Sequence, residues 1–185
     1  ASREREIEVT GATVEVPMVV GGASVAGDFI AEDAAFDGPV SLVGTVVRGG
    51  VYWQTAEVAG GIVANDFDAG YLDWRGVTVD GPLVFASSAF ASSLKLARSD
   101  ISGVLSLAET TSDWHIDATK LTVEGDVSIT GLTADGDIDF VGTQVDGDLD
   151  MRKLSVGGDA EWDHTLVGGE LLARDCSIEG EASFD

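Results

Sequence analysis

The sequence predicts an all-β fold: a single parallel β-helix, a quadrilateral solenoid with 11-residue half-coils and about 22 residues per coil. Three observations predict it. A short phrase recurs along the whole chain of 185 residues, most clearly in Val123–Ile129, Ala134–Phe140 and Val145–Met151. Apolar and polar residues alternate inside each copy, which is the period of a strand with one buried face. Glycine recurs between the apolar stretches, where the chain has to turn.

Each unit, counted from Ala1, predicts two short strands separated by a corner. The first strand surrounds position 3, which is mostly Val, Phe or Ile, as at Val14. Position 5 is glycine in many units and is followed by Asp or Glu, which indicates a bend. The second strand has apolar residues at positions 7 and 9 around a polar position 8, and position 7 runs from Ile7 to Ala182.

Two units are needed for one coil, because two short sides cannot enclose a core and four can. Strands stacked about 4.8 Å apart then give about eight coils and a rod roughly 40 Å long. The register slips once, at Phe67–Gly76, where the unit holds ten residues. Across this slip we expect Trp53 and Trp74 to stack in the core.

The repeats leave no linker, so we expect residues 1–185 to form a single solenoid domain. The chain starts at Ala1 without methionine and stops in mid-repeat at Asp185, and we expect it to be a piece of a longer protein. The charged segment Ser2–Glu6 is predicted to blunt the first strand edge. The last strand edge has no such segment, so we expect either that the natural chain continues or that this edge docks on another copy.

The single cysteine, Cys176, excludes an internal disulfide framework and slightly favours a reducing, cytoplasmic compartment; localisation is otherwise open. It starts a unit at a position where small inward residues recur, so we expect it to be buried. No apolar run approaches the roughly 20 residues that span a bilayer, and no direct membrane insertion is expected.

The chain is strongly acidic, with 33 Asp and Glu against 10 Lys and Arg and a net charge of −23. Such a surface repels nucleic acids and anionic membranes, so no nucleic-acid partner is expected. Two interpretations remain: adaptation to high salt, or an acidic decoy that mimics DNA. Low lysine and widespread aspartate favour the first.

Stacked units should arrange carboxylates in ladders. The predicted ladders are Asp126, Asp148 and Glu170 on one side and Asp137, Asp159 and Glu181 on the opposite side. Carboxylate oxygens are ligands for Ca²⁺, which makes these residues weak metal candidates. The alternative is that they cap turns and solvate the rod. Because the nonapeptide Ca²⁺ repeat is absent, we predict no metal and no cofactor.

One side of the rod should depart from this acidity. Units that begin at Thr45, Phe67, Ser88 and Thr110 are predicted to share a side. The candidate interaction residues there are Arg48, Tyr52, Tyr71, Arg75, Lys95, Arg98, Trp114, His115 and Lys120. Aromatic residues and arginine are enriched in protein interfaces. The alternative is scatter, since every chain exposes some aromatic residues.

Catalytic patterns are weak, and we predict that the chain is not an enzyme. His115 and His164 are more than two coils apart, and neither has a Cys or Ser at a known catalytic spacing. The alternation places Ile116 inward and His115 on the surface. Repeated carboxylates are a poor indication of acid–base catalysis without a cleft to perturb them.

The phrase apolar-x-Gly-Asp-apolar-x-apolar at Val145–Met151 resembles pentapeptide-repeat proteins with one residue added to every second side. The central and minus-two apolar positions of that family would correspond to Val145 with Thr143 and to Met151 with Leu149. The resemblance implies a right-handed quadrilateral β-helix. A weaker resemblance is to bactofilins, polymer-forming cytoskeletal β-helices with shorter coils. Neither family is typically enzymatic.

We therefore expect a structural or scaffold module, adapted to high salt, that mediates protein–protein association or self-assembly end to end or side by side. Two alternatives stay open: an acidic DNA mimic that occupies a nucleic-acid enzyme, and an extramembrane spacer or sensor domain of a larger protein.

Overall fold

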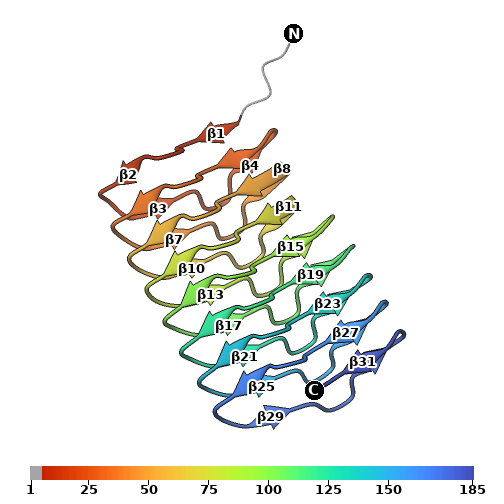
Figure 1. Ribbon diagram of the computed structural model, residues 1–185. Helices are drawn as coiled ribbons and strands as arrows, with labels where there is room; N and C mark the ends of the chain where they lie inside the picture. The colour runs from red at the N-terminus through yellow and green to blue at the C-terminus, as the bar shows by residue number, and fades with distance from the viewer. Residues whose placement is uncertain (1–5) are drawn as a thin grey trace.

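The computed structural model describes residues 6–185. It confirms the predicted solenoid: short parallel strands stack in about eight turns, and strands one turn apart pair with partners 22 residues away, as Ile116 does with Ile138 (Figure 1). The segment Ser2–Glu6, which was predicted to blunt the first strand edge, lies outside the described residues except for Glu6. Within residues 6–185 there is no helix long and apolar enough to cross a membrane.

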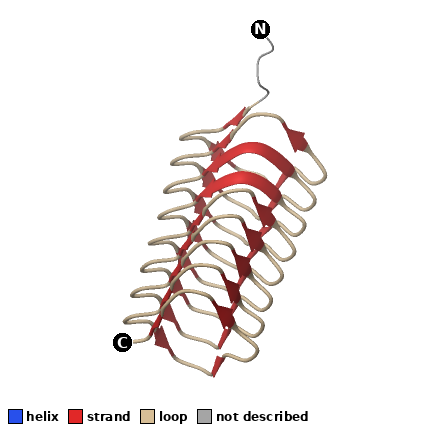
Figure 2. Ribbon diagram, turned by 90° about the vertical axis from the view of Figure 1, so that its right-hand side faces the viewer, coloured by secondary structure: helices blue, strands red, loops and turns tan. Residues whose placement is uncertain are grey.

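The strands form four sides that are joined by corners, with the longer strands β8 and β11 running across one corner (Figure 2). Side 1 consists of β1 (Ile7–Glu8), β5 (Phe29–Ile30), the second part of β8 (Val46–Tyr52) and of β11 (Asp68–Asp73), β15 (Leu94–Lys95), β19 (Ile116–Asp117), β23 (Ile138–Asp139), β27 (Ala160–Glu161) and β31 (Ala182–Ser183). Side 2 consists of β2 (Thr13–Val14), β6 (Ala35–Phe36), β9 (Glu57–Val58), β12 (Thr78–Val79), β16 (Asp100–Ile101), β20 (Thr122–Val123), β24 (Gln144–Val145) and β28 (Leu166–Val167).

Side 3 consists of β3 (Met18–Val19), β7 (Val40–Ser41), β10 (Ile62–Val63), β13 (Leu83–Val84), β17 (Leu105–Ser106), β21 (Val127–Ser128), β25 (Leu149–Asp150) and β29 (Leu171–Leu172). Side 4 consists of β4 (Ser24–Val25), the first part of β8 and of β11, β14 (Ala89–Phe90), β18 (Thr111–Ser112), β22 (Thr133–Ala134), β26 (Ser155–Val156) and β30 (Ser177–Ile178). Because β8 and β11 continue around the corner, sides 4 and 1 form one sheet.

The predicted register slip lies at this corner. β11 pairs with β8 as Ala69 with Val47, and past Gly70 as Tyr71 with Gly50, so the spacing between partners becomes shorter by a single residue. Gly70 therefore stands opposite two residues of the coil before, Arg48 and Gly49. A Cβ on Gly70 would lie 2.8 Å from the Gly49 carbonyl oxygen, so the shortened corner requires glycine.

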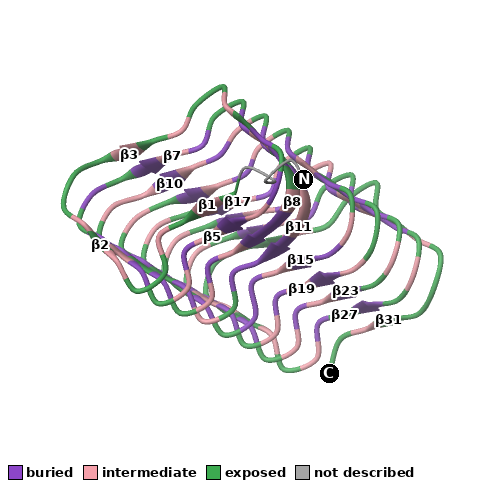
Figure 3. Ribbon diagram, turned by 90° about the horizontal axis from the view of Figure 1, so that it is seen from above, coloured by how far each residue is buried: buried purple, intermediate pink, exposed green. Residues whose placement is uncertain are grey.

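The core is one continuous stack of inward-facing apolar side chains. Buried residues recur on coil after coil along the length of the rod (Figure 3). Trp53 and Trp74 are fully buried and stack with ring centroids 4.7 Å apart, as predicted. Phe36 stacks on the other face of Trp53 at 5.0 Å. Aromatic pairs of this kind add about 0.5–1.5 kcal/mol beyond the burial of their area.

Small polar residues at the start of several units also point inward, and each links two coils. The hydroxyl of Thr110 donates to the Phe85 carbonyl at 2.6 Å, and Thr143 donates to Ala118 at 2.6 Å. Both threonines are fully buried. These bonds give the buried hydroxyl groups a partner, which they would otherwise lack at a cost in stability.

Cys176 occupies the same inward position, and its Sγ lies 3.0 Å from the Met151 carbonyl oxygen. The prediction that it is buried is wrong, because the cysteine is exposed. The reason is its place in the last described coil, which no further coil covers. Leu171 and Phe184 in the same coil are likewise about half exposed, at 50% and 57%.

The recurring Gly-Asp pair is explained by contacts between neighbouring coils. Oδ1 of Asp126 accepts a hydrogen bond from the backbone N–H of Asp148, one coil further on, at 2.9 Å. Asp137 does the same for Asp159 at 2.9 Å. The glycine before each donor is required as well, since a Cβ on Gly147 would lie 2.3 Å from Asp126 Oδ1. Aspartate and glycine are therefore two halves of one inter-coil contact.

We predict that Asp137→Ala lowers the free energy of unfolding by about 1 kcal/mol, because the Asp159 N–H loses its acceptor. Asp137→Asn should retain the stability, since it keeps an acceptor oxygen and removes a negative charge. Urea unfolding measures both.

The matched control is Asp135→Ala, because the Asp135 carboxylate accepts no hydrogen bond from the described residues; its unfolding free energy should stay nearly unchanged. Equal losses for the alanine and asparagine variants of Asp137 would show that the charge, and not the acceptor, stabilises the corner.

Candidate interaction surface

The structure brings together most of the nine residues predicted to form an interaction surface. The units that begin at Thr45, Phe67, Ser88 and Thr110 lie on successive coils, as predicted, and run from side 4 across the corner to side 1. Tyr52, Tyr71 and Lys95 lie over side 1 of these coils. We call these three residues and Arg75 the basic-aromatic patch.

The patch is built on packed aromatic rings. Tyr52 and Tyr71 have ring centroids 5.8 Å apart, and the Nζ of Lys95 lies 5.6 Å from the centre of the Tyr71 ring. Gly50 makes room for this arrangement, because a Cβ there would lie 2.4 Å from the Tyr52 ring. Burial, followed by the charge of Asp28, raises the pKa of Tyr52. The tyrosine is therefore neutral at physiological pH and presents a polar tip on an apolar ring.

Asp73 holds the patch together, and it was not among the residues predicted from the sequence. Its side chain accepts hydrogen bonds from Arg75 Nε at 2.8 Å and Nη2 at 2.7 Å, and from the Tyr71 hydroxyl at 3.3 Å. Asp73 is 3% exposed. Burial acts to raise its pKa, but the hydrogen bonds and charge of Arg75 outweigh it and hold the pKa below its ordinary value. The pair fixes the guanidinium, whose side chain is half exposed.

The sequence contains a pattern that indicates the role of Asp73. An outward aspartate at the end of a strand often accepts from the backbone N–H two residues later. Asp139 does so with Val141 at 2.9 Å, and Asp150 with Arg152 at 3.1 Å. An arginine two residues after such an aspartate, as in Asp73 and Arg75, therefore predicts a fixed ion pair.

The remaining predicted residues lie around the patch. Arg98 and Lys120 have positive φ angles of 60° and 55° at the corner between sides 1 and 2, on adjacent coils. Arg98 shares a hollow of about 320 Å³ with Arg75. His115 is half-buried, with Nδ1 3.3 Å from the Ser93 hydroxyl. Trp114 is 62% exposed at the corner between sides 4 and 1.

Arg48 is separate from the patch. It is exposed on the side 4 flank of the corner, where it lines a different hollow together with Asp68 and Asp113. Sequence periodicity placed it on the correct coil and could not show on which flank of the corner it lies.

Acidic side chains surround a hollow of about 420 Å³ on side 1, directly after the patch. The acidic residues lining it are Asp117, Asp137, Asp139, Asp159 and Glu161. Burial, together with the charges of Asp117 and Asp163, raises the pKa of Asp139 even though its carboxylate accepts the Val141 N–H. The repeat pattern indicated Asp137 and Asp159 here, but not the three outward strand residues Asp117, Asp139 and Glu161.

The six weak metal candidates form the two predicted ladders, at diagonally opposite corners. Asp148 and Asp159 each donate a backbone N–H to the coil before and accept one from the coil after, at Glu170 and Glu181, both 2.8 Å away. Within residues 6–185, no group of three or more His, Cys, Asp or Glu side chains has the arrangement of a metal site. Inter-coil hydrogen bonding therefore accounts for these aspartates.

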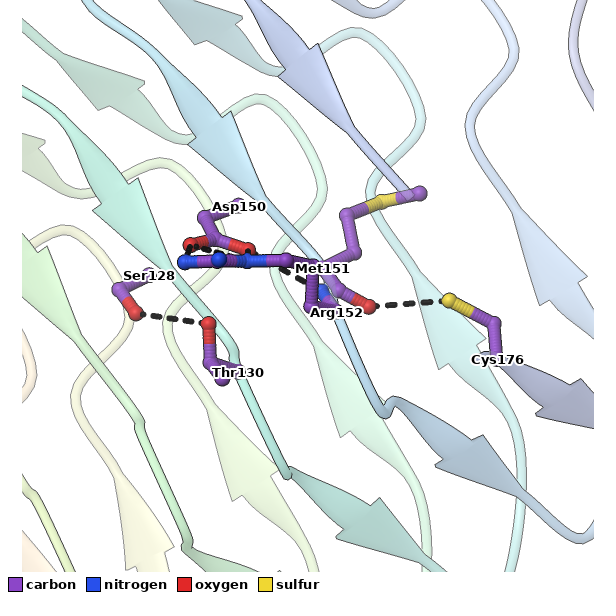
Figure 4. A network of polar contacts seen from close by, with 6 residues as sticks. All are labelled: Ser128, Thr130, Asp150, Met151, Arg152 and Cys176. Carbon is purple, nitrogen blue, oxygen red and sulfur yellow. Dashed lines mark hydrogen bonds and ion pairs between the residues drawn. The ribbon is translucent and has the colours of Figure 1, made fainter. Parts of the chain in front are cut away.

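A second ion pair lies outside the predicted surface, on side 3 (Figure 4). Arg152 Nε and Nη2 bind the Asp150 carboxylate, with Nη2 2.5 Å from Oδ2. This hydrogen bonding lowers the pKa of Asp150 to about 2. Ser128 and Thr130 of the coil before lie beside it and bond to each other at 3.4 Å.

Comparison with protein-family models, with curated proteins and with solved structures finds no significant match to this chain. The resemblance to pentapeptide-repeat proteins therefore stays a prediction, and the fold assignment depends on the strand pairing.

The Asp150–Arg152 ion pair predicts that part of the protein's stability is lost in acid. Because the folded-state pKa of Asp150 is lowered, its contribution to the free energy of unfolding is present above the unfolded pKa of 3.8. This contribution is lost as pH falls through about 2. We expect Asp150→Asn to be less stable than the unaltered protein at pH 6 and equally stable below pH 2. Urea unfolding across this range measures the difference; a constant difference at every pH would contradict the assignment.

Proposed function

We propose that this protein is a non-enzymatic scaffold module that associates with protein through the basic-aromatic patch on side 1. One observation carries the proposal: four of the eight Lys and Arg residues in 6–185 lie over side 1 and its adjoining corner, in a chain of net charge −23. Two arginines, two lysines and two tyrosines gather over side 1 and its adjoining corner.

The construction of the patch supports binding. Asp73 holds Arg75 in a fixed position, and the two tyrosine rings and Lys95 pack on one another. Fixed aromatic and arginine side chains lose little conformational entropy on association, which is the property of residues that dominate interface energies. The rod itself supplies a rigid support, since every strand of the patch is hydrogen-bonded to coils on both sides. The same cations disfavour a DNA mimic at this surface.

A photo-crosslinking amino acid at Tyr71 tests the proposal in the cells that make the protein. We expect discrete cross-linked species from Tyr71, and fewer of them when Arg75→Ala and Lys95→Ala are added. The matched control is the same probe at Val84, an outward residue of β13 on side 3. Equal cross-linking from both positions, or none from Tyr71, would contradict the proposal.

We also propose that the module is adapted to high salt. Carboxylates on adjacent coils stack along two corners, and charges about 4.8 Å apart repel unless salt screens them. The thermal midpoint should therefore rise from low to molar KCl, and should rise less in Asp126→Asn, which keeps the ladder acceptor. A midpoint that does not change with KCl would contradict the adaptation.

A further inference from the structure

The outward surface of side 1 changes from basic and aromatic to acidic halfway along the rod. Its strands pair coil by coil in one register, so each outward residue stacks on the next. The outward residues in order are Ile30, Tyr52, Asp73, Lys95, Asp117, Asp139, Glu161 and Ser183. Because Arg75 neutralises Asp73, the half up to Lys95 is basic and aromatic. The half from Asp117 onwards is acidic and hollowed.

We propose that side 1 is a self-complementary surface on which a second copy of this chain docks with its rod antiparallel. The basic-aromatic half of each copy then covers the acidic half of the other. This inference rests on the proposed function, since it identifies the protein partner of the patch as a second copy.

Symmetry and charge together select the antiparallel arrangement. A two-fold axis along the rod would place Lys95 against Lys95 and Asp117 against Asp117 of the second copy. A two-fold axis across the rod, between the coils of Lys95 and Asp117, inverts the order instead. Lys95 then faces Asp117 of the second copy, and Arg75 faces its Asp139. Each contact occurs twice.

The same register gives exposed Trp114 a place to pack. Trp114 occupies the corner position where glycine usually stands, on the coil of Asp117. The two-fold axis carries it to the corresponding corner on the coil of Lys95, which consists of Ser92 and Ser93. Ser93 is buried, and both side chains are small. The protruding indole of one copy therefore meets a low point on the other.

The available area is sufficient for a modest interface. Side 1 is about 38 Å tall from the strand spacing and about 17 Å wide at five residues per side. Two copies would bury on the order of 1,300 Å², at the lower end of stable protein–protein interfaces. A reversible dimer is therefore expected.

One contact in this register is unfavourable. At the corner between sides 1 and 2, Arg98 faces Lys120 of the second copy, and this rim pair repels. The proposal thus makes opposite predictions for two lysines on adjacent coils. Lys95→Glu should weaken the dimer, and Lys120→Glu should tighten it, although both change the net charge by the same amount.

Sedimentation velocity of the purified chain tests this at an ionic strength of about 0.15 M. The Debye length there is about 8 Å, so long-range repulsion between the acidic rods is screened and contacting pairs are kept. We expect a concentration-dependent dimer. Lys95→Glu and Asp117→Lys should each raise its dissociation constant by at least about tenfold, and the double variant should recover most of that loss.

Lys153→Glu is the matched control, because it makes the same charge change at an exposed corner away from side 1 and should leave the dissociation constant unchanged. Circular dichroism checks the folding of each variant. If Asp117→Lys does not fold, the proposal is tested by the opposite shifts in dissociation constant that Lys95→Glu and Lys120→Glu should produce.

A monomer at every concentration would overturn the self-association. So would a dimer that Lys95→Glu leaves unchanged, or a double variant as weak as the single ones. A purified monomer whose Tyr71 probe still cross-links another protein in cells would overturn only the second-copy partner and leave the proposed function standing.

Discussion

Coil-on-coil register is the constraint on which the rest of this structure depends. Parallel strands must return to the same register on every coil so that each backbone N–H finds a carbonyl on the neighbouring coil and each inward side chain finds its counterpart. The chain allows one departure, at Gly70, where a glycine corner absorbs a missing residue without moving the strands on either side. The indole stack of Trp53 on Trp74 crosses this same point undisturbed.

The corners serve both stability and surface chemistry. At the corner between sides 4 and 1, Asp28 bonds to the Gly50 N–H, and the aspartate contact returns only at Asp137. Between them the same position holds Gly50, Tyr71, Ser93 and His115. The patch thus lies where the stabilising Gly-Asp contact is absent. Functional surfaces are the places where a sequence is expected to depart from the pattern that stabilises the fold.

Most of the fold could be predicted from the sequence, because so short and regular a repeat leaves few arrangements that bury every apolar position. The candidate site was harder to predict from the sequence. Periodicity assigned Tyr52, Tyr71 and Lys95 to one side, since coil membership follows from residue number. It could not find Asp73, whose burial depends on side chains folding over it, nor separate Arg48 from the patch across a corner. Cys176 was expected to be buried because its position was treated as an interior one, whereas the last described coil has no neighbour to cover it.

The coil register is tested most directly by electron–electron distances between spin labels at Ser41 and Ser128, in a Cys176→Ser background. Both are outward residues of side 3, four coils apart across the register slip. The backbone separation should be about 19 Å at 4.8 Å per coil. Moving the second label to Asp150, one coil further, should lengthen the distance by about 5 Å. An unchanged or shorter distance would contradict the stacking on which the patch and the proposed dimer both depend.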